Sequence, residues 1–190
     1  MIPKGKKNIY GVVLVGVFGA LVFVSNYLSV PIPVAIGDVS RIHFGNIFCL
    51  LSGFALGPVW GGLAAGIGSA LYDLTNPAYI ASAPFTFVFK FLLAAVCGWV
   101  ANGGGANAEK HIRNILAAVS GSVVYMVLYL SKSFFQGILL GSEMGAVLTA
   151  VGTKTVTSSI NAAIAVVVSV PLYTVLRAAI RKFFVSAKMG

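Results

Sequence analysis

Long apolar runs alternate with short polar stretches along the whole chain. The runs occupy about residues 9–30, 43–56, 59–74, 85–101, 115–130 and 146–176. A helix needs about 20 apolar residues to cross a bilayer, so the short second and third runs imply tilt, a thinned membrane or partial burial within the protein. The pattern predicts an all-α integral membrane protein, a compact bundle of six transmembrane helices in which residues 1–190 form a single domain.

The composition agrees with a lipid environment. Hydrophobic residues make up 58% of the 190 and charged residues 9%, whereas an average soluble domain has about 25% charged residues. A soluble fold of this size could not cover so much apolar surface. Cys49 and Cys97 lie inside apolar runs, so we expect small buried hydrophobic side chains there rather than a disulfide or a metal site.

Basic residues occur mainly in three groups, which predict how the chain is oriented in the membrane. They precede the first run, separate the fourth from the fifth, and follow the sixth: Lys4, Lys6, Lys7, Lys110, Arg113, Arg177, Arg181, Lys182 and Lys188. With six spans all three groups fall on one side, which should be the cytoplasm, so both termini are expected there. The first run lacks a small-residue cleavage pattern and is expected to be a retained helix. The net charge of +9 then indicates orientation rather than nucleic-acid binding.

Polar and ionisable side chains also occur within the runs and beside the loops that would face outward. Such groups are costly in a bilayer and are candidates for function. Lys154, Ser158 and Asn161 share one helix face because they are spaced at i, i+4 and i+7. The sequence predicts a polar substrate-binding cavity in the outer half of the membrane, formed by Asp38, Arg41, Asp73, Lys90, Tyr125, Tyr129, Lys132, Lys154, Ser158 and Asn161.

These polar groups also have structural interpretations. Lys90 and Lys154 could extend their side chains to the membrane interface instead of contacting a ligand. Asp38 and Asp73 could cap helices, or pair with Arg41 or a lysine.

The segment 37–101 resembles the substrate-binding S components of energy-coupling factor (ECF) vitamin importers, in the branch that includes riboflavin-type proteins. The matching features, in order, are Gly37-Asp38, the sequence Leu-Leu-Ser-Gly-Phe-Ala-Leu-Gly-Pro at 50–58, the glycine-rich run that leads to Tyr72-Asp73, and Ala83-Pro84-Phe85-Thr86-Phe87 before Lys90.

The resemblance implies a subunit that captures a vitamin or related small heterocyclic metabolite from outside. Delivery would then pass through a transmembrane coupling subunit that carries two ABC ATPases. S components often present an alanine-x-x-x-alanine face on the first helix for docking, and the corresponding pair here is Gly16 and Ala20. The chain would be a multi-pass protein of a bacterial plasma membrane. The lipid bilayer would therefore be a further partner. We expect no cofactor bound by this chain. It has no P-loop, so it would not itself hydrolyse ATP, and the partner ATPases would use the ATP.

Small residues four apart also recur in the run 59–74, where Gly62 and Gly66 form one such pair. They let another backbone approach closely, and we expect them to pack within the bundle.

Two other functions remain open from the sequence. One is a stand-alone small transporter. The other is an intramembrane aspartyl protease in which Asp38 and Asp73 share a proton and activate water.

Overall fold

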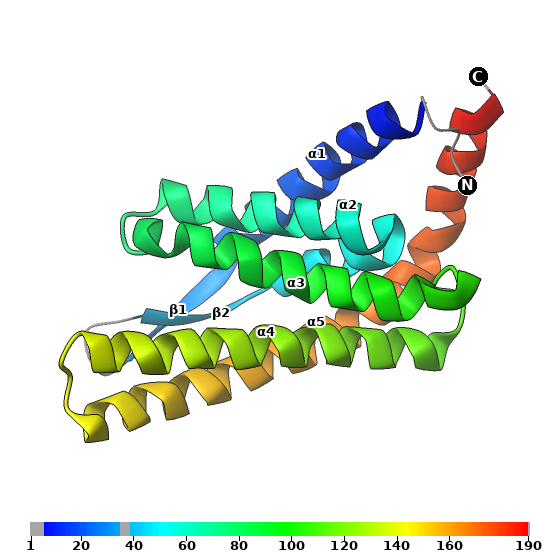
Figure 1. The fold of residues 1–190 in the computed structure, drawn as a ribbon. Helices are drawn as coiled ribbons and strands as arrows, with labels where there is room; N and C mark the ends of the chain where they lie inside the picture. The colour runs from blue at the N-terminus through cyan, green and yellow to red at the C-terminus, as the bar shows by residue number, and fades with distance from the viewer. Residues whose placement is uncertain (1–5, 35–38, 190) are drawn as a thin grey trace.

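The computed structural model describes residues 6–34 and 39–189, and its described part is built mainly from α-helices (Figure 1). In chain order the elements are α1 (Lys6–Tyr27), β1 (Ser29–Pro33), β2 (Val39–His43), α2 (Gly45–Thr75), η2 (Ile80–Ser82), α3 (Ala83–Asn102), η3 (Gly103–Gly105), α4 (His111–Leu139) and α5 (Met144–Met189). Apart from the β1–β2 hairpin the fold is all-α, so the all-α class predicted from the sequence is confirmed.

Helix α2 folds back on itself at Gly57. This residue has a φ of +80°, which favours glycine, and Pro58 follows it, where it can begin a helix but not continue one. The hydroxyl of Ser52 donates to the carbonyl oxygen of Gly61 at 3.0 Å, and Cys49 Sγ lies 3.8 Å from Ser69 Oγ. The two arms of α2 therefore run antiparallel, and they correspond to the second and third apolar runs.

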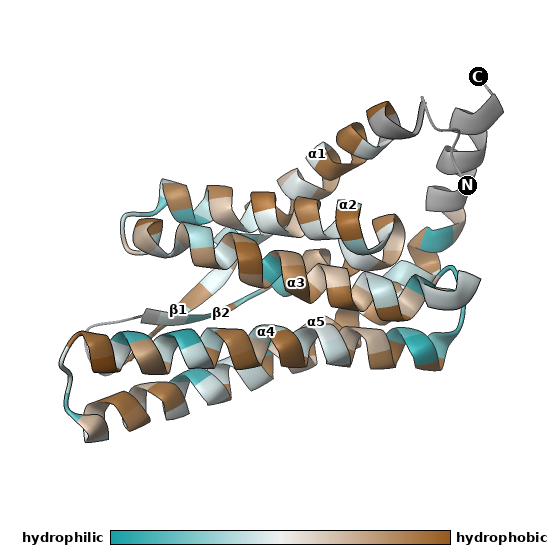
Figure 2. Ribbon diagram, viewed as in Figure 1, coloured by the Kyte–Doolittle hydropathy of each residue, from teal (hydrophilic) through white to brown (hydrophobic). Residues whose placement is uncertain are grey.

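Four helices in the described part of the chain are long and apolar enough to cross a membrane. They occupy Gly45–Thr75, Ile80–Gly105, His111–Leu139 and Met144–Ala179, and a shorter apolar helix covers Gly11–Tyr27. Many large apolar side chains face outward: Trp99 is 70% exposed and Leu139 85%. Figure 2 shows hydrophobic residues along the full length of the bundle. An apolar exterior of this extent identifies a membrane protein.

The glycines of the second α2 arm let neighbouring helices approach closely. A Cβ at Gly62 or Gly66 would lie within 3 Å of Phe91 or Phe87 of α3, and one at Gly68 would clash with the carbonyl oxygen of Gly19 in α1. These contacts confirm that the small residues of the run 59–74 pack within the bundle.

The segment after the first helix differs from the expectation. We expected a helix to continue to Val30, but α1 ends at Tyr27, and Ser29–Pro33 pairs antiparallel with Val39–His43. Pro31 and Pro33 cannot donate helical hydrogen bonds and they disfavour helical geometry in the residue before them. Among the described residues each strand has a single neighbour, so β1 tolerates prolines at its free edge.

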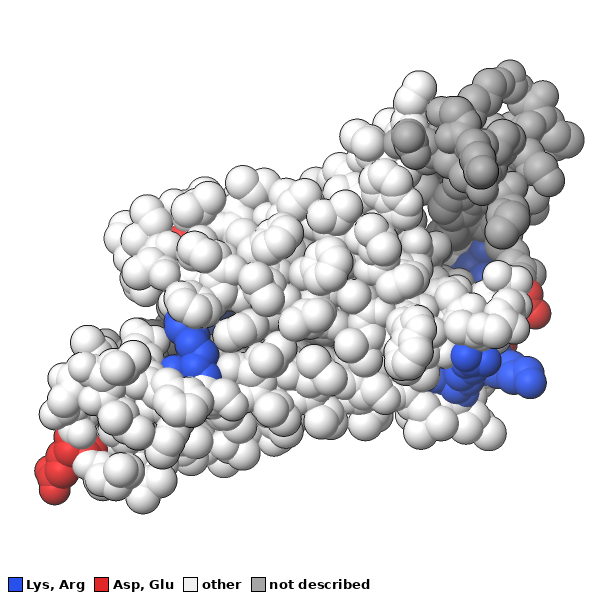
Figure 3. Space-filling view, viewed as in Figure 1, with Lys and Arg blue, Asp and Glu red and all other residues white. Residues whose placement is uncertain are grey.

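The bundle has two different ends. Arg177 of α5 donates to the carbonyl oxygen of Glu109 at 3.2 Å, so the later part of α5 lies beside the α3–α4 connection, and the start of α1 lies at the same end (Figure 1). The hairpin, η2 and the α4–α5 connection lie at the other end. Figure 3 shows Lys and Arg atoms near both ends, with a nearly uncharged surface between them.

Candidate binding cavity

A cavity of about 80 Å³ lies at the hairpin end of the bundle and is lined by β2, α2, η2, α3, α4 and α5. The structure brings together there all of the predicted residues that it describes: Arg41, Asp73, Lys90, Tyr125, Tyr129, Lys132, Lys154, Ser158 and Asn161. Asp38 lies outside the described residues. The lining also includes residues that the sequence did not single out as ligand contacts: Ser40, His43, Tyr79, Ser82, Phe85, Thr86, Phe89, Ser133 and Gln136.

Arg41 and Asp73 form a buried ion pair on one side of the cavity. Arg41 Nη2 lies 3.0 Å from Asp73 Oδ1, and the two side chains are 14% and 3% exposed. The guanidinium also lies between two aromatic rings, 4.4 Å from the centroid of Tyr72 and 4.3 Å from that of Tyr79. Thr86 donates to the second carboxylate oxygen of Asp73. Of the interpretations left open by the sequence, pairing of Asp73 with Arg41 is therefore confirmed.

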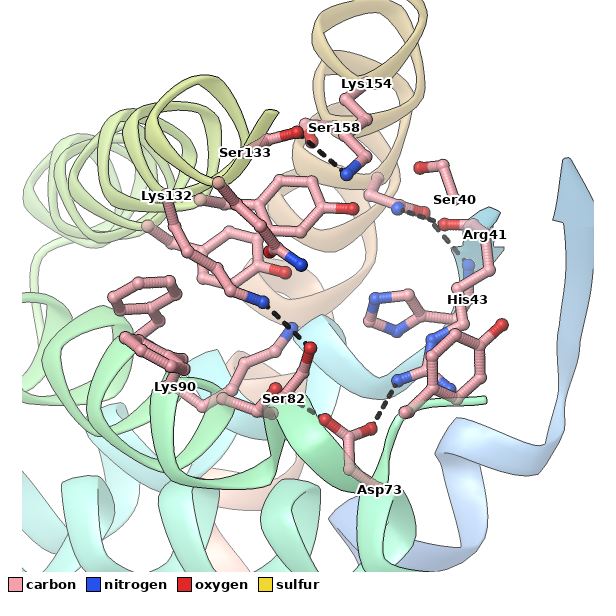
Figure 4. A pocket seen from close by; sticks show the side chains of 18 residues that line it. Ser40, Arg41, His43, Asp73, Ser82, Lys90, Lys132, Ser133, Lys154 and Ser158 are labelled. Carbon is pink, nitrogen blue, oxygen red and sulfur yellow. Dashed lines mark hydrogen bonds and ion pairs between the residues drawn. The ribbon is translucent and has the colours of Figure 1, made fainter. Parts of the chain in front are cut away.

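Lys90 and Lys154 enter the cavity from opposite helices. Each residue is 3% exposed, so both side chains lie inside the protein rather than along its outer surface, as cavity lining requires and snorkelling does not. Lys90 donates to Asn46 Oδ1 and lies 4.1 Å from the centroid of the Tyr125 ring. Lys154 donates to Ser133 Oγ at 2.8 Å. Figure 4 shows both ammonium groups directed toward the same cavity.

Two tyrosines of α4 line the cavity between the lysines. The rings of Tyr125 and Tyr129 are stacked one helical turn apart, with centroids 5.8 Å apart and planes inclined by 6°. Lys154 lies 5.4 Å from the centroid of Tyr129. Lys132, one turn further along α4, is half-buried and donates to Ser82 of η2 at 2.8 Å. Tyr125, Tyr129 and Lys132 of α4 therefore all face the cavity.

Asn161 of α5 fixes β2, the strand that carries Arg41. Its side-chain oxygen accepts from the backbone N–H of His43 at 3.0 Å, and its amide donates to the carbonyl oxygen of Arg41 at 2.8 Å. The hydroxyls of Ser40 and Thr157 are 2.7 Å apart. These three contacts attach the hairpin to the bundle along one side of the cavity.

His43, the last residue of β2, is a cavity residue that sequence reasoning missed. Its Nδ1 accepts from the backbone N–H of Gly45 at 3.1 Å, so the neutral ring carries its proton on Nε2. Burial, and then the positive charges of Lys90 and Arg41, hold the pKa of His43 well below its usual value. The available signal was its position two residues before α2, where a side chain can accept a hydrogen bond from the first free N–H groups of the helix.

The chemistry of the lining suits binding. Cationic groups, hydroxyls, an amide and aromatic faces converge without a pair of carboxylates among the described lining residues. Within residues 6–34 and 39–189, no group of three or more His, Cys, Asp or Glu side chains could hold a metal ion.

The predicted docking residues lie elsewhere, on the outer face of α1. Gly16 and Ala20 are exposed, and a Cβ added at Gly16 would meet nothing within 4 Å. Both line an apolar groove of about 660 Å³ between α1 and the second arm of α2, together with Val12, Val15, Gly19, Phe23, Ile67, Leu71, Leu74 and Thr75.

Comparisons with known proteins agree with this picture. The family model described as "ECF-type riboflavin transporter, S component" matches residues 6–178. A protein of Pyrococcus woesei, described as "Uncharacterized protein in gap 3'region", is 33% identical over 107 residues, which are 56% of this chain and 66% of that protein, just under two thirds of its length. A solved structure described as "Structure and mechanism of the S component of a bacterial ECF transporter" has a TM-score of 0.66 at 19% identity, covering 90% of this chain and 97% of the other, and shows a shared fold.

The family match removes one of the two functions that the sequence left open. It covers most of the chain, and the family consists of transporter subunits rather than enzymes, so the aspartyl protease alternative is wrong. One of its two aspartates, Asp73, is moreover held in an ion pair with Arg41. The chain belongs to the family of S components of ECF-type riboflavin transporters.

Proposed function

We propose that this chain captures a vitamin or related small heterocyclic metabolite from outside a bacterial cell and presents it for ATP-driven import. The observation that carries the proposal is the convergence of buried polar side chains from β2 and four helices on one cavity of an otherwise apolar bundle. The stacked rings of Tyr125 and Tyr129 suit the flat body of a heterocycle. The surrounding ammonium, hydroxyl and amide groups suit the polar edges of such a heterocycle. We therefore propose the predicted site residues as ligand contacts.

The proposed topology has six spans, with both termini in the cytoplasm and the cavity facing outward. Its support is the antiparallel course of the two α2 arms, which would act as two spans. The α3–α4 connection and the start of α4, which carry Lys110 and Arg113, also lie at the end opposite the cavity, and Arg177 contacts this connection. A cysteine placed near Asn76 or Ser142, on a background lacking Cys49 and Cys97, should be labelled from outside. Labelling near Gly104 from outside would contradict this topology.

The proposed energy source is a partner. The sequence has no P-loop, so uphill movement would depend on a transmembrane coupling subunit and two ABC ATPases that use the ATP. The proposed contact is the face formed by Gly16 and Ala20, which is open in this fold and borders an apolar groove. Small residues at such a face let a partner helix approach closely.

Two measurements on the purified chain test the proposal. Native mass spectrometry should find a small metabolite bound to the protein. Proteoliposomes that contain only this chain should bind that metabolite but should not accumulate it when a proton or sodium gradient is applied. Accumulation by the chain alone would identify a stand-alone transporter and overturn the proposed role.

A further inference from the structure

The cavity has more positive than negative groups. Four cationic side chains line it, Arg41, Lys90, Lys132 and Lys154, against one described carboxylate, Asp73. If Asp38 is counted as a second carboxylate, two cations remain in excess. The family description names riboflavin, which has no group that ionises at neutral pH, so a neutral vitamin would leave this excess uncompensated.

Lys90 shows the imbalance most directly. Its ammonium group is buried, and its partners in the structure are the side-chain oxygen of Asn46 and the ring of Tyr125. Both are uncharged. A buried ammonium ion is stabilised most effectively by a negative charge that also accepts its hydrogen bonds. Lys90 therefore retains donor capacity toward the cavity.

Arg41 provides a second hydrogen-bond donor that lacks an acceptor. Its Nη2 is engaged by Asp73, whereas its Nη1 is buried without a hydrogen-bond partner. The stacking of Tyr72 and Tyr79 on the guanidinium holds it in place. A buried donor that lacks an acceptor is unfavourable, and a ligand oxygen would satisfy it.

Two further lysines reach the cavity from the far wall. Lys132 donates to the hydroxyl of Ser82, and Lys154 donates to the hydroxyl of Ser133. Figure 4 shows Lys132 and Lys154 extending from the α4 and α5 side toward Lys90 and Arg41 on the opposite side. A group bound between these two sides would be surrounded by cations.

We infer that the substrate carries an ionised acidic group, a carboxylate or a phosphate, which binds between Lys90, Arg41 and the lysines of the far wall. This inference rests on the proposed function and narrows its substrate class. The acidic group accepts hydrogen bonds from Lys90 Nζ and Arg41 Nη1, and the ring stack of Tyr125 and Tyr129 contacts the rest of the molecule.

Matched pairs of probes test the inference on the purified full-length chain. Riboflavin and flavin mononucleotide differ by a phosphate, and nicotinamide and nicotinate differ by an amide in place of a carboxylate. In at least one pair the acid should bind about tenfold or more tightly than its neutral partner, as expected for charge-assisted hydrogen bonds. The pair that shows the difference identifies the acidic group. Native mass spectrometry of the co-purified metabolite gives an independent answer.

Variants separate a charge effect from a general loss of binding. Lys90→Met keeps the length of the side chain and should abolish the preference for the acid. Lys110→Met removes an exposed lysine at the opposite end and should leave the preference intact. Equal or tighter binding of the neutral member in every pair, or a neutral co-purified metabolite, would overturn the inference while leaving the proposed function standing. If no metabolite co-purifies and no probe binds, the proposed function fails and the inference fails with it.

Discussion

Two hollows in the described part of the bundle have opposite chemistry. The cavity at the hairpin end has a volume of about 80 Å³ and is lined by charged, hydroxyl and aromatic groups. The groove between α1 and the second arm of α2 is larger, about 660 Å³, and its lining is apolar except for the hydroxyl of Thr75. Size alone would favour the groove as the ligand site. The chemistry of the two linings instead favours the smaller, polar cavity.

The difference follows from what each surface faces. Buried charges are costly and persist where partners compensate them or where function requires them, so the charged cavity is suited to a ligand from water. An apolar groove on the outside of a membrane helix can accept lipid or another transmembrane helix without any polar contact. The cavity is therefore expected to control affinity and the groove to control coupling, which substitutions in either hollow can test.

The largest expected effect comes from the groove. Gly16→Leu places a bulky side chain where a partner helix would dock, so uptake into cells should fall to background while ligand affinity stays near normal. The control is Gly152→Leu on α5, because Gly152 is also an exposed helical glycine whose added Cβ would meet nothing within 4 Å. Loss of ligand binding in the Gly16 variant would show that this face belongs to the folded core.

A smaller but still large effect is expected from the ion pair beside the cavity. Asp73→Asn leaves the guanidinium of Arg41 without its carboxylate, and breaking a buried pair in this way should lower the free energy of unfolding by about 3–5 kcal/mol. Denaturant unfolding in detergent measures the change. In the double variant Arg41→Leu with Asp73→Leu, no buried charge is left uncompensated, so much of the stability should return. Equal losses in the single and double variants would contradict the assigned role of the pair.

The sequence predicted the helices and most of the cavity because both depend on spacing along a helix. The stripe of Lys154, Ser158 and Asn161 needs only the helical period, and all three residues line the cavity. His43 and Ser40 were missed because their positions depend on the β1–β2 hairpin. This hairpin was not predicted, because its first strand is part of an apolar run that contains prolines. The burial of Lys90 and Lys154 also could not be decided from sequence, since snorkelling and cavity lining require the same residue at the same depth.

An intermediate effect is expected where the hairpin is attached to α5. Asn161→Ala removes two hydrogen bonds that position β2, so Arg41 loses its fixed place and ligand affinity should fall by about 1–3 kcal/mol. Titration with the metabolite identified by mass spectrometry measures this. Asn102→Ala is the matched control, because the amide of Asn102 donates to backbone carbonyls at the other end of the bundle, including that of Gly98 at 3.0 Å. Equal losses of affinity in both variants would indicate a general effect on folding.

The smallest expected effect is a pH dependence that originates in the cavity. The folded state holds the pKa of His43 below its usual value, whereas in the unfolded chain it should be about 6.5. Below that pH the unfolded state binds a proton that the folded state does not. The contribution to stability is therefore complete above about pH 6.5 and is lost as the pH falls, with a slope of at most about 1.4 kcal/mol per pH unit.

Unfolding measured between about pH 7.5 and 5.5 tests this expectation. His43→Gln removes the titrating group and should flatten the profile in that range. His111→Gln should preserve the profile, because His111 is exposed at the opposite end of the bundle. An unchanged slope in the His43 variant would assign the pH dependence to another group. A flattened slope would confirm that His43 is held neutral beside Lys90 and Arg41, which leaves those two cations as the charges available to a ligand in that part of the cavity.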